Sequence, residues 1–237
     1  SDEIYIADQR VIRKFDLGKN LVYFITGSNS EYASTDGTLA EGRFRNIQDI
    51  AVSNDGNKIY VIEDNKIRTV DLVNETVSTL TGHQDWSFVN GSLSNARFQG
   101  PRSIAMDSND NLIVSEYGSL RKIDIENDLV STLVNNQWGW GDLFIDGSDN
   151  IYYTNYDRHM IELYSSDGEL SRVMDSYNSS GTVDGVLKDA KISRPDDILI
   201  SSAGNLIFSN EQNKLRKIDF INKLRIPAGS KTGTFTL

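Results

Sequence analysis

The chain repeats itself with a period of roughly 47 residues, and this repeat constrains the fold more than any other sequence feature. The repeated segment starts with an apolar, β-branched run. In most copies it ends with one or two basic residues, an apolar residue and then Asp. The clearest copies are residues 59–71 and 112–124, with near copies beginning at Ile4 and Leu206 and a weaker one over 151–164. One copy is too small to bury its own apolar side, so neighbouring copies are expected to stack.

Two further apolar segments accompany most copies of the repeat. A short run such as 50–52 or 104–106 precedes a copy, and another such as 77–80 follows it, with turn residues between the segments. Tight-turn residues flanked by β-branched alternation are typical of hairpins. No segment has the 3.6-residue periodicity of a long amphipathic helix. The sequence therefore predicts four short antiparallel strands in each unit and an all-β fold.

Stacked four-stranded sheets leave two open end faces unless the array closes into a ring, which favours a β-propeller. At roughly 47 residues per unit, the 237 residues predict about five blades. The first copy starts at its second strand, so we expect the alternating tail, residues 231–237, to pair beside residues 4–7 and close the propeller. A six-bladed propeller, complete or truncated by one blade, is the alternative.

The expected organisation is a single domain over residues 1–237. Three stretches between the copies share Asp or Asn, then Gly, then an apolar residue at fixed spacing, which predicts that each forms the same loop inserted between sheets: 36–44, 90–98 and 184–192. The predicted blades cover residues 1–27 plus 231–237, 45–82, 99–134, 138–174 and 193–229.

The repeats resemble those of the NHL-repeat β-propellers over essentially the whole chain. The resemblance rests on Pro-x-x-Ile-Ala at 101–105, Leu-Arg-Lys-Ile-Asp at 120–124, Val-Ser-Thr-Leu at 77–80 and the Asp/Asn-Gly loops. Residues 138–141, Trp-Gly-Trp-Gly, depart from the pattern. The family resemblance implies a platform for binding proteins, although some members bind RNA and a few relatives are lyases, hydrolases or ligand sensors.

Composition narrows these functions. The chain has 24 Lys and Arg against 34 Asp and Glu, for a net charge of −10, so nucleic acid and membrane insertion are not expected. Cysteine is absent and only two histidines occur, which excludes thiolate chemistry and a three-histidine metal site. The sequence favours a non-catalytic role without a cofactor.

Polar residues recur where the second strand of each unit ends, and they are the first candidates for a binding site. Such a set could form a partly acidic ring that receives a basic peptide or holds Ca²⁺ in the central channel. The structural alternative is that each side chain caps its own turn by accepting backbone N–H groups. The candidates are Asp8, Glu63, Glu116, Asn155, and Asn210 with its neighbour Glu211.

Aromatic residues provide the second set of candidates. Trp138 and Trp140 lie in a Gly-spaced loop, where an exposed indole ring would suit a sugar or a protein partner; packing into the space of the missing inter-sheet loop is the alternative. Further binding candidates are Trp86, Tyr156 and His159.

From these residues we predict a protein-binding recognition module, extracellular or on a cell surface, within a longer chain. A carbohydrate-binding propeller is the second hypothesis. A metal-dependent enzyme of lactonase or lyase type is the third, and it would need a metal at the axis.

Overall fold

A computed structural model describes residues 3–135, 139, 141–177, 179–185, 187, 189–211, 214–219 and 234–235. The chain divides into two compact units, which are described separately. The first comprises Ser1–Glu116 and Arg121–Thr132, and the second comprises Tyr117–Leu120 and Leu133–Leu237. Regular structure in the described residues is entirely β, and no described helix is long and apolar enough to span a bilayer.

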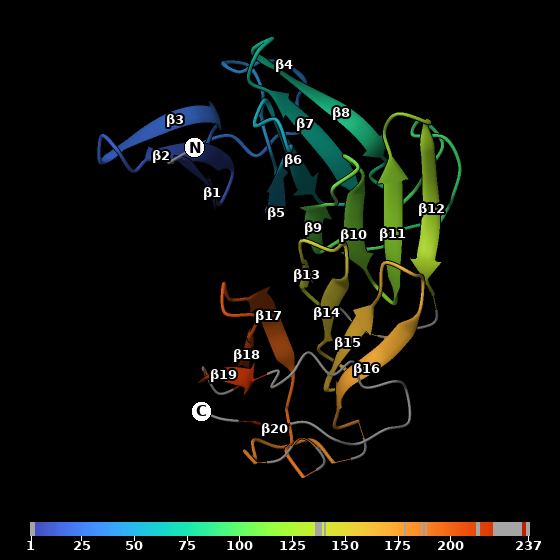
Figure 1. Cartoon of the computed structure of the whole chain (residues 1–237). Helices are drawn as coiled ribbons and strands as arrows, with labels where there is room; N and C mark the ends of the chain where they lie inside the picture. The colour runs from blue at the N-terminus through green and yellow to red at the C-terminus, as the bar shows by residue number, and fades with distance from the viewer. Residues whose placement is uncertain are drawn as a thin grey trace. The chain divides into compact units, whose positions relative to one another are not determined.

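The strands form five antiparallel sheets (Figure 1). The first sheet contains β1 (Glu3–Asp8), β2 (Val11–Asp16) and β3 (Leu21–Gly27). The second contains β5 (Ile47–Val52), β6 (Lys58–Glu63), β7 (Lys66–Asp71) and β8 (Thr76–Gly82), with β4 (Gly37–Thr38) beside β8. The third contains β9 (Ser103–Met106), β10 (Leu112–Glu116), β11 (Ser119–Asp124) and β12 (Leu129–Val134).

The fourth and fifth sheets lie in the second unit. The fourth contains β13 (Leu143–Ile145), β14 (Ile151–Asn155), β15 (Met160–Tyr164) and β16 (Leu170–Asp175). The fifth contains β17 (Pro195–Ile200), β18 (Leu206–Asn210), β19 (Lys214–Asp219) and β20 (Thr234–Phe235). Five sheets with this meander order are the blades of a five-bladed β-propeller, so the predicted fold class is confirmed.

The prediction that the C-terminal tail pairs beside residues 4–7 is wrong. Thr234 and Phe235 pair with Asp219 and Ile218 of β19, so they supply the outer strand of the fifth sheet and do not lie beside β1. The physical reason is that the outer edge of β19 offers backbone groups for pairing as the edge of β1 does, and alternation in the tail does not select between two edges. In the described part of the chain the first sheet has three strands, and β1 pairs only with β2.

Successive sheets within a unit pack through the same positions of the repeat. In the second sheet Ile59, Val61 and Val70 are fully buried against Ile12 of β2. Their equivalents in the third sheet pack against the other face of the second sheet: Leu112, Val114 and Ile123. Those in the fifth sheet pack against β15 and β16 of the fourth: Leu206, Phe208 and Ile218. Because side chains alternate between the two faces of a strand, the second sheet has an apolar face toward each of its two neighbours.

The predicted loops between sheets are present. Each is held by an isolated β-bridge, Thr35 to Arg43, Val89 to Arg97 and Val183 to Lys191. Each bridge is followed by a fully buried apolar residue, and these anchors are Phe44, Phe98 and Ile192.

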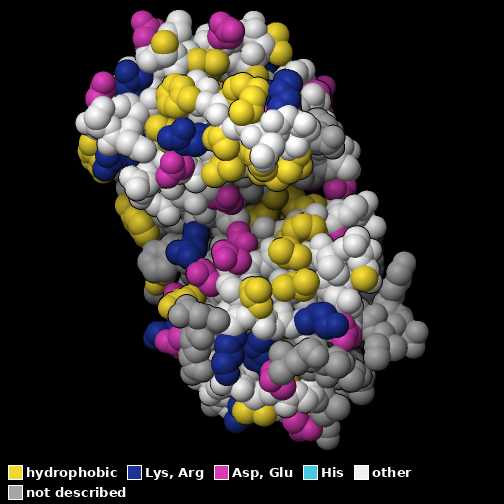
Figure 2. Space-filling model, turned by 90° about the vertical axis from the view of Figure 1, so that its left-hand side faces the viewer, with side chains coloured by type: hydrophobic (Ala, Val, Ile, Leu, Met, Phe, Trp, Pro, Cys, Tyr) yellow, Lys and Arg dark blue, Asp and Glu magenta, His cyan; other side chains and the backbone are white. Residues whose placement is uncertain are grey.

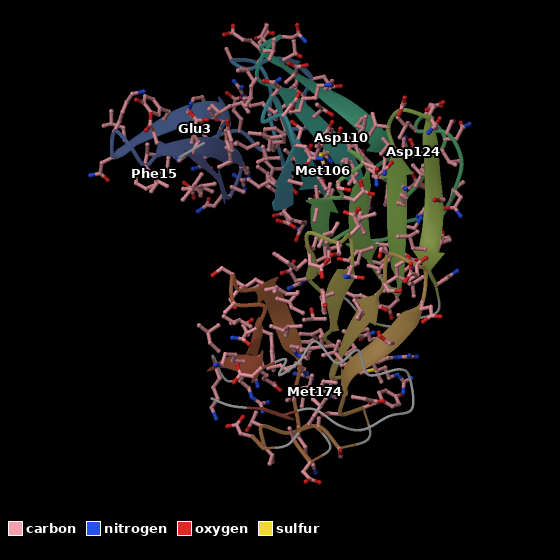
Figure 3. All side chains as sticks on the ribbon, viewed as in Figure 1. Glu3, Phe15, Met106, Asp110, Asp124 and Met174 are labelled. Carbon is pink, nitrogen blue, oxygen red and sulfur yellow. The ribbon has the colours of Figure 1, made fainter. Side chains whose placement is uncertain are left out.

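Within the described part of its own unit, the first sheet has another sheet packed on only one of its two faces. Ile4 and Ile6 lie on the other face, together with Val22 and Phe24. The upper part of Figure 2 shows hydrophobic side chains gathered on the side where the first sheet lies. Phe15, which pairs with Ile4 and is half-buried, belongs to the same face and is labelled on this sheet in Figure 3.

Candidate functional site

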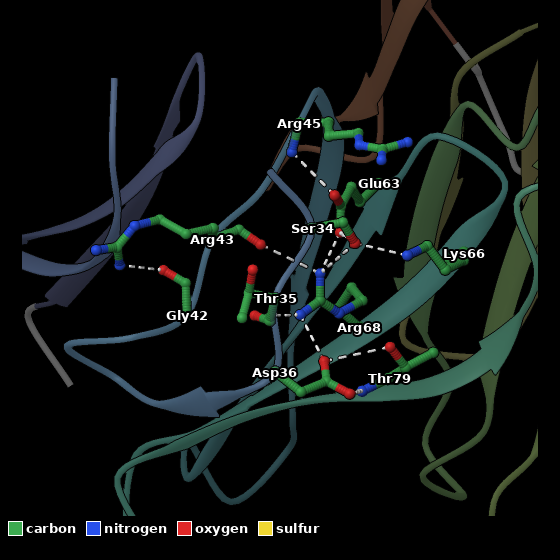
Figure 4. Close-up of polar contacts among 10 residues, drawn as sticks. All are labelled: Ser34, Thr35, Asp36, Gly42, Arg43, Arg45, Glu63, Lys66, Arg68 and Thr79. Carbon is green, nitrogen blue, oxygen red and sulfur yellow. Dashed lines mark hydrogen bonds and ion pairs between the residues drawn. The ribbon is translucent and has the colours of Figure 1, made fainter. Parts of the chain in front are cut away.

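Glu63, a predicted ring residue, is buried in an arginine-centred network (Figure 4). Its carboxylate accepts from Nη1 of Arg68 and from the backbone N–H of Arg45, the latter at 2.9 Å. Nη2 of Arg68 donates to the carbonyl of Thr35 at 2.9 Å and to Asp36 at 2.6 Å. The network ties the second sheet to the loop before it.

Glu116 occupies the same position in the third sheet. It accepts from Nη1 of Arg121 at 2.7 Å and from the backbone N–H of Gln99 at 2.6 Å. Arg121 is fully buried and also donates to the carbonyl of Val89 at 2.9 Å and to Asn90 at 2.7 Å. Each of these two glutamates therefore binds an arginine that in turn binds the loop between sheets, which gives the recurring arginines the structural role that their repetition indicates.

Asp8 is the half-exposed member of the set. Its carboxylate lies 3.3 Å from Nε of Arg13, and both side chains remain accessible to solvent. An ion pair of this exposure contributes little to stability.

Asn155 is the member that caps its own turn, as the structural alternative predicts. Its Oδ1 accepts from the backbone N–H of Arg158 at 3.1 Å. Gly139 lies directly against this side chain, because a Cβ built on Gly139 would come within 2.4 Å of Oδ1 of Asn155. Gly139 has a φ of +121°, so both its conformation and its lack of a side chain are required here.

Glu211 and His159 come together in the second unit around an arginine that sequence reasoning missed. Nη1 of Arg194 donates to Glu211 at 3.0 Å, and the backbone N–H of Arg194 donates to Nδ1 of His159 at 2.9 Å. The hydroxyl of Ser193 donates to the other carboxylate oxygen of Glu211 at 2.8 Å. The guanidinium lies 5.4 Å from the centre of the Tyr156 ring. We call Tyr156, His159, Ser193, Arg194 and Glu211 the Arg194 cluster.

The conformation of Arg194 is unusual for a residue with a side chain. Its φ is +45°, in the left-handed region. Gly100, at the equivalent place before the third sheet, has a φ of +63°. A non-glycine residue in this region costs about 1–2 kcal/mol, and such residues often mark functional sites. One sequence signal could have identified Arg194. It is an arginine at the position where the equivalent copy of the repeat has Gly100.

The electrostatics of the Arg194 cluster fix its protonation. Burial, and then the charge of Arg194, lower the pKa of His159, so the ring is neutral near pH 7. Since Nδ1 accepts a hydrogen bond, the proton lies on Nε2. The hydrogen bond from Ser193, together with Arg194, lowers the pKa of Glu211 and keeps it ionised.

A second cation, the half-buried Arg158, lies beside His159 of the Arg194 cluster in the sequence. Arg158, on the turn that also carries His159, lies 5.6 Å from the ring centre of Tyr177, which is 55% exposed. The surface therefore offers guanidinium and imidazole donors beside two aromatic rings. Groups of this kind suit carboxylates, carbonyl oxygens or hydroxyls of a ligand.

The tryptophan candidates are separate from the Arg194 cluster. Trp86 is 53% exposed in the first unit, in the segment where His83 contacts Asp85. Trp138 and Trp140 lie outside the described residues. Within the described ranges, no group of three or more His, Asp or Glu side chains could hold a metal ion.

Comparison with known proteins identifies the fold. No family model matches the chain, and no curated protein matches it. An auxiliary nutrient binding protein from Bacteroides thetaiotaomicron has a TM-score of 0.69 at 12% identity, over 99% of this chain and 53% of that one. The extracellular domain of a putative one component system from B. thetaiotaomicron has a TM-score of 0.60 at 12% identity, over 92% of this chain and 26% of that one.

A chain from a nidogen/laminin complex has a TM-score of 0.63 at 12% identity, over 99% of this chain and 84% of that one. At these identities the similarity is one of fold, and it agrees with the β-propeller described above. The chain spans about half the length of the nutrient binding protein.

Proposed function

We propose that this chain is a non-catalytic recognition module that binds a protein partner through the Arg194 cluster. The observation that carries the proposal is the way Arg194 is held. Its backbone is fixed by His159, its guanidinium lies over Tyr156, and Glu211 binds only one of its terminal nitrogens. A partner therefore meets an ordered cation and loses little side-chain entropy on binding. Arginine and tyrosine are also the residues that most often dominate binding energy at protein interfaces.

The expected ligand group on the partner is a carboxylate or a chain of backbone carbonyls. The net charge of −10 repels acidic partners over most of the surface, whereas Arg158 and Arg194 place two cations in this patch beside the ionised Glu211. An acidic side chain next to an apolar one on the partner would match the guanidinium and the Tyr156 and Tyr177 rings.

We further propose that the repeats are of the NHL type and that the module works on or outside a cell. The repeat motifs support the first point, and the solved structures of similar fold support the second, because one is an extracellular domain and another is a nutrient binding protein. A carbohydrate ligand is the second candidate, favoured by the exposed rings of Trp86 and Tyr177.

Selection from a displayed peptide library, run beside an array of oligosaccharides, tests the proposal. We expect peptides with an acidic residue next to an aromatic or aliphatic one to be enriched. Arg194→Ala should weaken the binding of a selected peptide by about tenfold or more, the scale of an interface hot spot.

Arg172→Ala is the matched control, because Arg172 is an equally exposed arginine of the same unit that pairs with Asp175 outside the cluster. It should leave peptide affinity unchanged. Binding to oligosaccharides alone would establish the second candidate. Peptide binding that is indifferent to Arg194→Ala would remove the cluster from the interface.

A further inference from the structure

Two arginines of the first unit, Arg10 and Arg45, form no ion pair in the described part of the chain. The chain has 34 acidic residues against 24 basic ones, so acidic partners are abundant. Other arginines of the same unit each contact a carboxylate: Arg13, Arg43, Arg68 and Arg97. The lack of such a contact at two neighbouring arginines is therefore unusual in this molecule.

The two guanidinium groups gather at one exposed ring. Their central carbons lie 5.0 and 5.9 Å from the ring centre of Tyr32, which is 65% exposed. Nε of Arg10 also donates to the carbonyl of Arg45 at 3.0 Å, and its Nη1 donates to that of Asn29 at 3.1 Å. Ring and carbonyl contacts orient a guanidinium group but leave its positive charge without a counterion. Two positive charges are therefore held close together.

Several donors of this pair have no acceptor among the described residues. Nε of Arg45 is buried and unpartnered, because Arg45 bonds to Glu63 only through its backbone N–H (Figure 4). Both terminal nitrogens of Arg45 and Nη2 of Arg10 likewise make no hydrogen bond in this part of the structure. A buried N–H without an acceptor is unfavourable, so an acceptor from outside the chain would stabilise this arrangement.

The nearby acidic residues do not supply that acceptor. The carboxylate of Glu63 accepts from Arg68. Burial, and then the charge of Glu63, raise the pKa of Asp64, and the charge of Arg45 only opposes this shift. Asp64 and Arg45 form no ion pair within the described ranges. The counterion of Arg10 and Arg45 is therefore expected to come from a ligand.

Both arginines depart from the repeat. In the third sheet the residue equivalent to Arg45 is Gln99, whose backbone N–H makes the same hydrogen bond to the glutamate of its own sheet. In the second sheet the residue equivalent to Arg10 is Asn65, whose side chain also donates to a carbonyl of the loop that follows. The equivalent residues make these local contacts without a positive charge, so the scaffold does not require the two arginines.

We infer that Arg10 and Arg45 together bind the phosphate or sulfate group of a small molecule. A planar guanidinium group can donate two parallel hydrogen bonds to such an oxyanion, and two of these groups match its charge and its several oxygens better than those of one carboxylate. The net charge of −10 disfavours a polyanion, which restricts the ligand to a small one. Tyr32 is a positioning residue, because it holds both guanidinium groups.

Inorganic phosphate and sulfate are the probes, added to the whole chain at pH 7 and constant ionic strength, so that general screening does not change. The arginine Nε–H signals in NMR spectra should show saturable shifts for Arg10 and Arg45 at millimolar concentrations, and calorimetry gives the affinity. Acetate, the carboxylate probe, should bind at least several-fold more weakly. The tighter of phosphate and sulfate identifies the class of ligand.

Arg45→Gln and Arg10→Asn introduce the residues that the equivalent copies of the repeat contain. Each should weaken phosphate binding by at least about tenfold, the scale of one lost hydrogen bond between charged groups. Arg13→Gln is the matched control, because it removes one positive charge from a half-exposed arginine of the same unit. It should leave the affinity unchanged. An unchanged melting temperature in phosphate-free buffer shows that each variant is folded.

Three results would overturn the inference. The Nε–H signal of Arg45 could fail to move, or move without saturation, as phosphate and sulfate are added. Arg13→Gln could weaken binding as much as Arg45→Gln, which would mean that binding follows the overall charge. Acetate could bind as tightly as phosphate, which would make the ligand group a carboxylate. The residues of this site belong to the first unit, so none of these results bears on peptide selection at the Arg194 cluster.

Discussion

The second and fourth sheets place opposite charges at the same position of the repeat. Arg68 in β7 lies across from Val61, and Glu162 in β15 lies across from Tyr153. Both side chains are buried, with exposed fractions of 0% and 1%. Arg68 has acidic and carbonyl partners on the loop before its sheet, whereas Oε2 of Glu162 has no hydrogen-bond partner among the described residues.

This difference indicates that the loop before a sheet, more than the sheet itself, determines which charge can be buried at this position. Arginine occurs at the buried position in the second, third and fifth sheets, and in each case it donates to a carbonyl and an Asp or Asn of an Asp/Asn-Gly loop. The fourth sheet is preceded by a stretch without that loop sequence. An arginine there would lose those acceptors, and a buried cation without acceptors is strongly unfavourable.

The largest effect is expected from breaking the arginine network of the second sheet. Arg68→Ala leaves the buried carboxylate of Glu63 without its cation and leaves the carbonyl of Thr35 without its donor. We expect a loss of about 3–5 kcal/mol in the free energy of unfolding, the usual cost of removing one partner of a buried pair. Urea denaturation followed by circular dichroism measures it.

Arg13→Ala is the control for that measurement, because Arg13 occupies the same repeat position in the first sheet. Its pair with Asp8 is half-exposed, so its loss should cost less than about 1 kcal/mol. Equal effects of the two substitutions would show that burial of the network does not determine its contribution.

The next effect is a pH dependence of stability that arises from Glu162. Burial raises the pKa of Glu162 in the folded protein, although Tyr153 and Arg172 oppose the shift. The stability linked to this group is fully present below the ordinary glutamate pKa and is lost as the pH rises through the raised pKa of the folded state. Glu162→Gln should therefore raise the free energy of unfolding at pH 8 by about 1–2 kcal/mol, the scale for one unpaired buried polar group.

At pH 4 the same substitution should have little effect, because Glu162 is then mostly protonated in the unfolded state as well as in the folded state. Urea denaturation of both proteins across this range measures the difference. Glu169→Gln, at a surface glutamate of the turn after β15, is the control and should give a flat difference. A difference for Glu162→Gln that is the same at both pH values would contradict the raised pKa.

The sequence predicted the sheets because their signal is local. Hairpin turns and alternation placed β10 and β11, and the repeated arginine indicated a structural role that Arg68 and Arg121 have. The position of residues 234–235 could not be predicted in this way, because two open edges competed for one short tail. Alternation of apolar and polar residues indicates that a segment is a strand, but it does not indicate which sheet edge the strand joins.

The candidate site was predicted only in part, for a related reason. His159, Tyr156 and Glu211 were selected as single residues, and the structure joins them through Arg194. Sequence reasoning sought recurring polar residues, whereas Arg194 is a departure from the repeat at a left-handed position. Glu63 and Glu116 recur because they hold loops. In a repeat protein, recurrence therefore marks the scaffold, and departures from it are better guides to binding residues.

The smallest effect on stability is expected at Arg194. Arg194 and Gly100 occupy equivalent positions of the repeat but differ in residue type, as Arg68 and Glu162 do. Arg194→Gly relieves a left-handed conformation worth about 1–2 kcal/mol. It also removes an exposed ion pair with Glu211, worth up to about 1 kcal/mol, and a contact with the Tyr156 ring of similar size. These terms nearly cancel, so the free energy of unfolding should change by less than about 1 kcal/mol. The affinity for a selected peptide should fall as it does in Arg194→Ala. A marked loss of stability together with unchanged peptide binding would make Arg194 a structural residue, like the arginines of the buried networks, and would end its separate role.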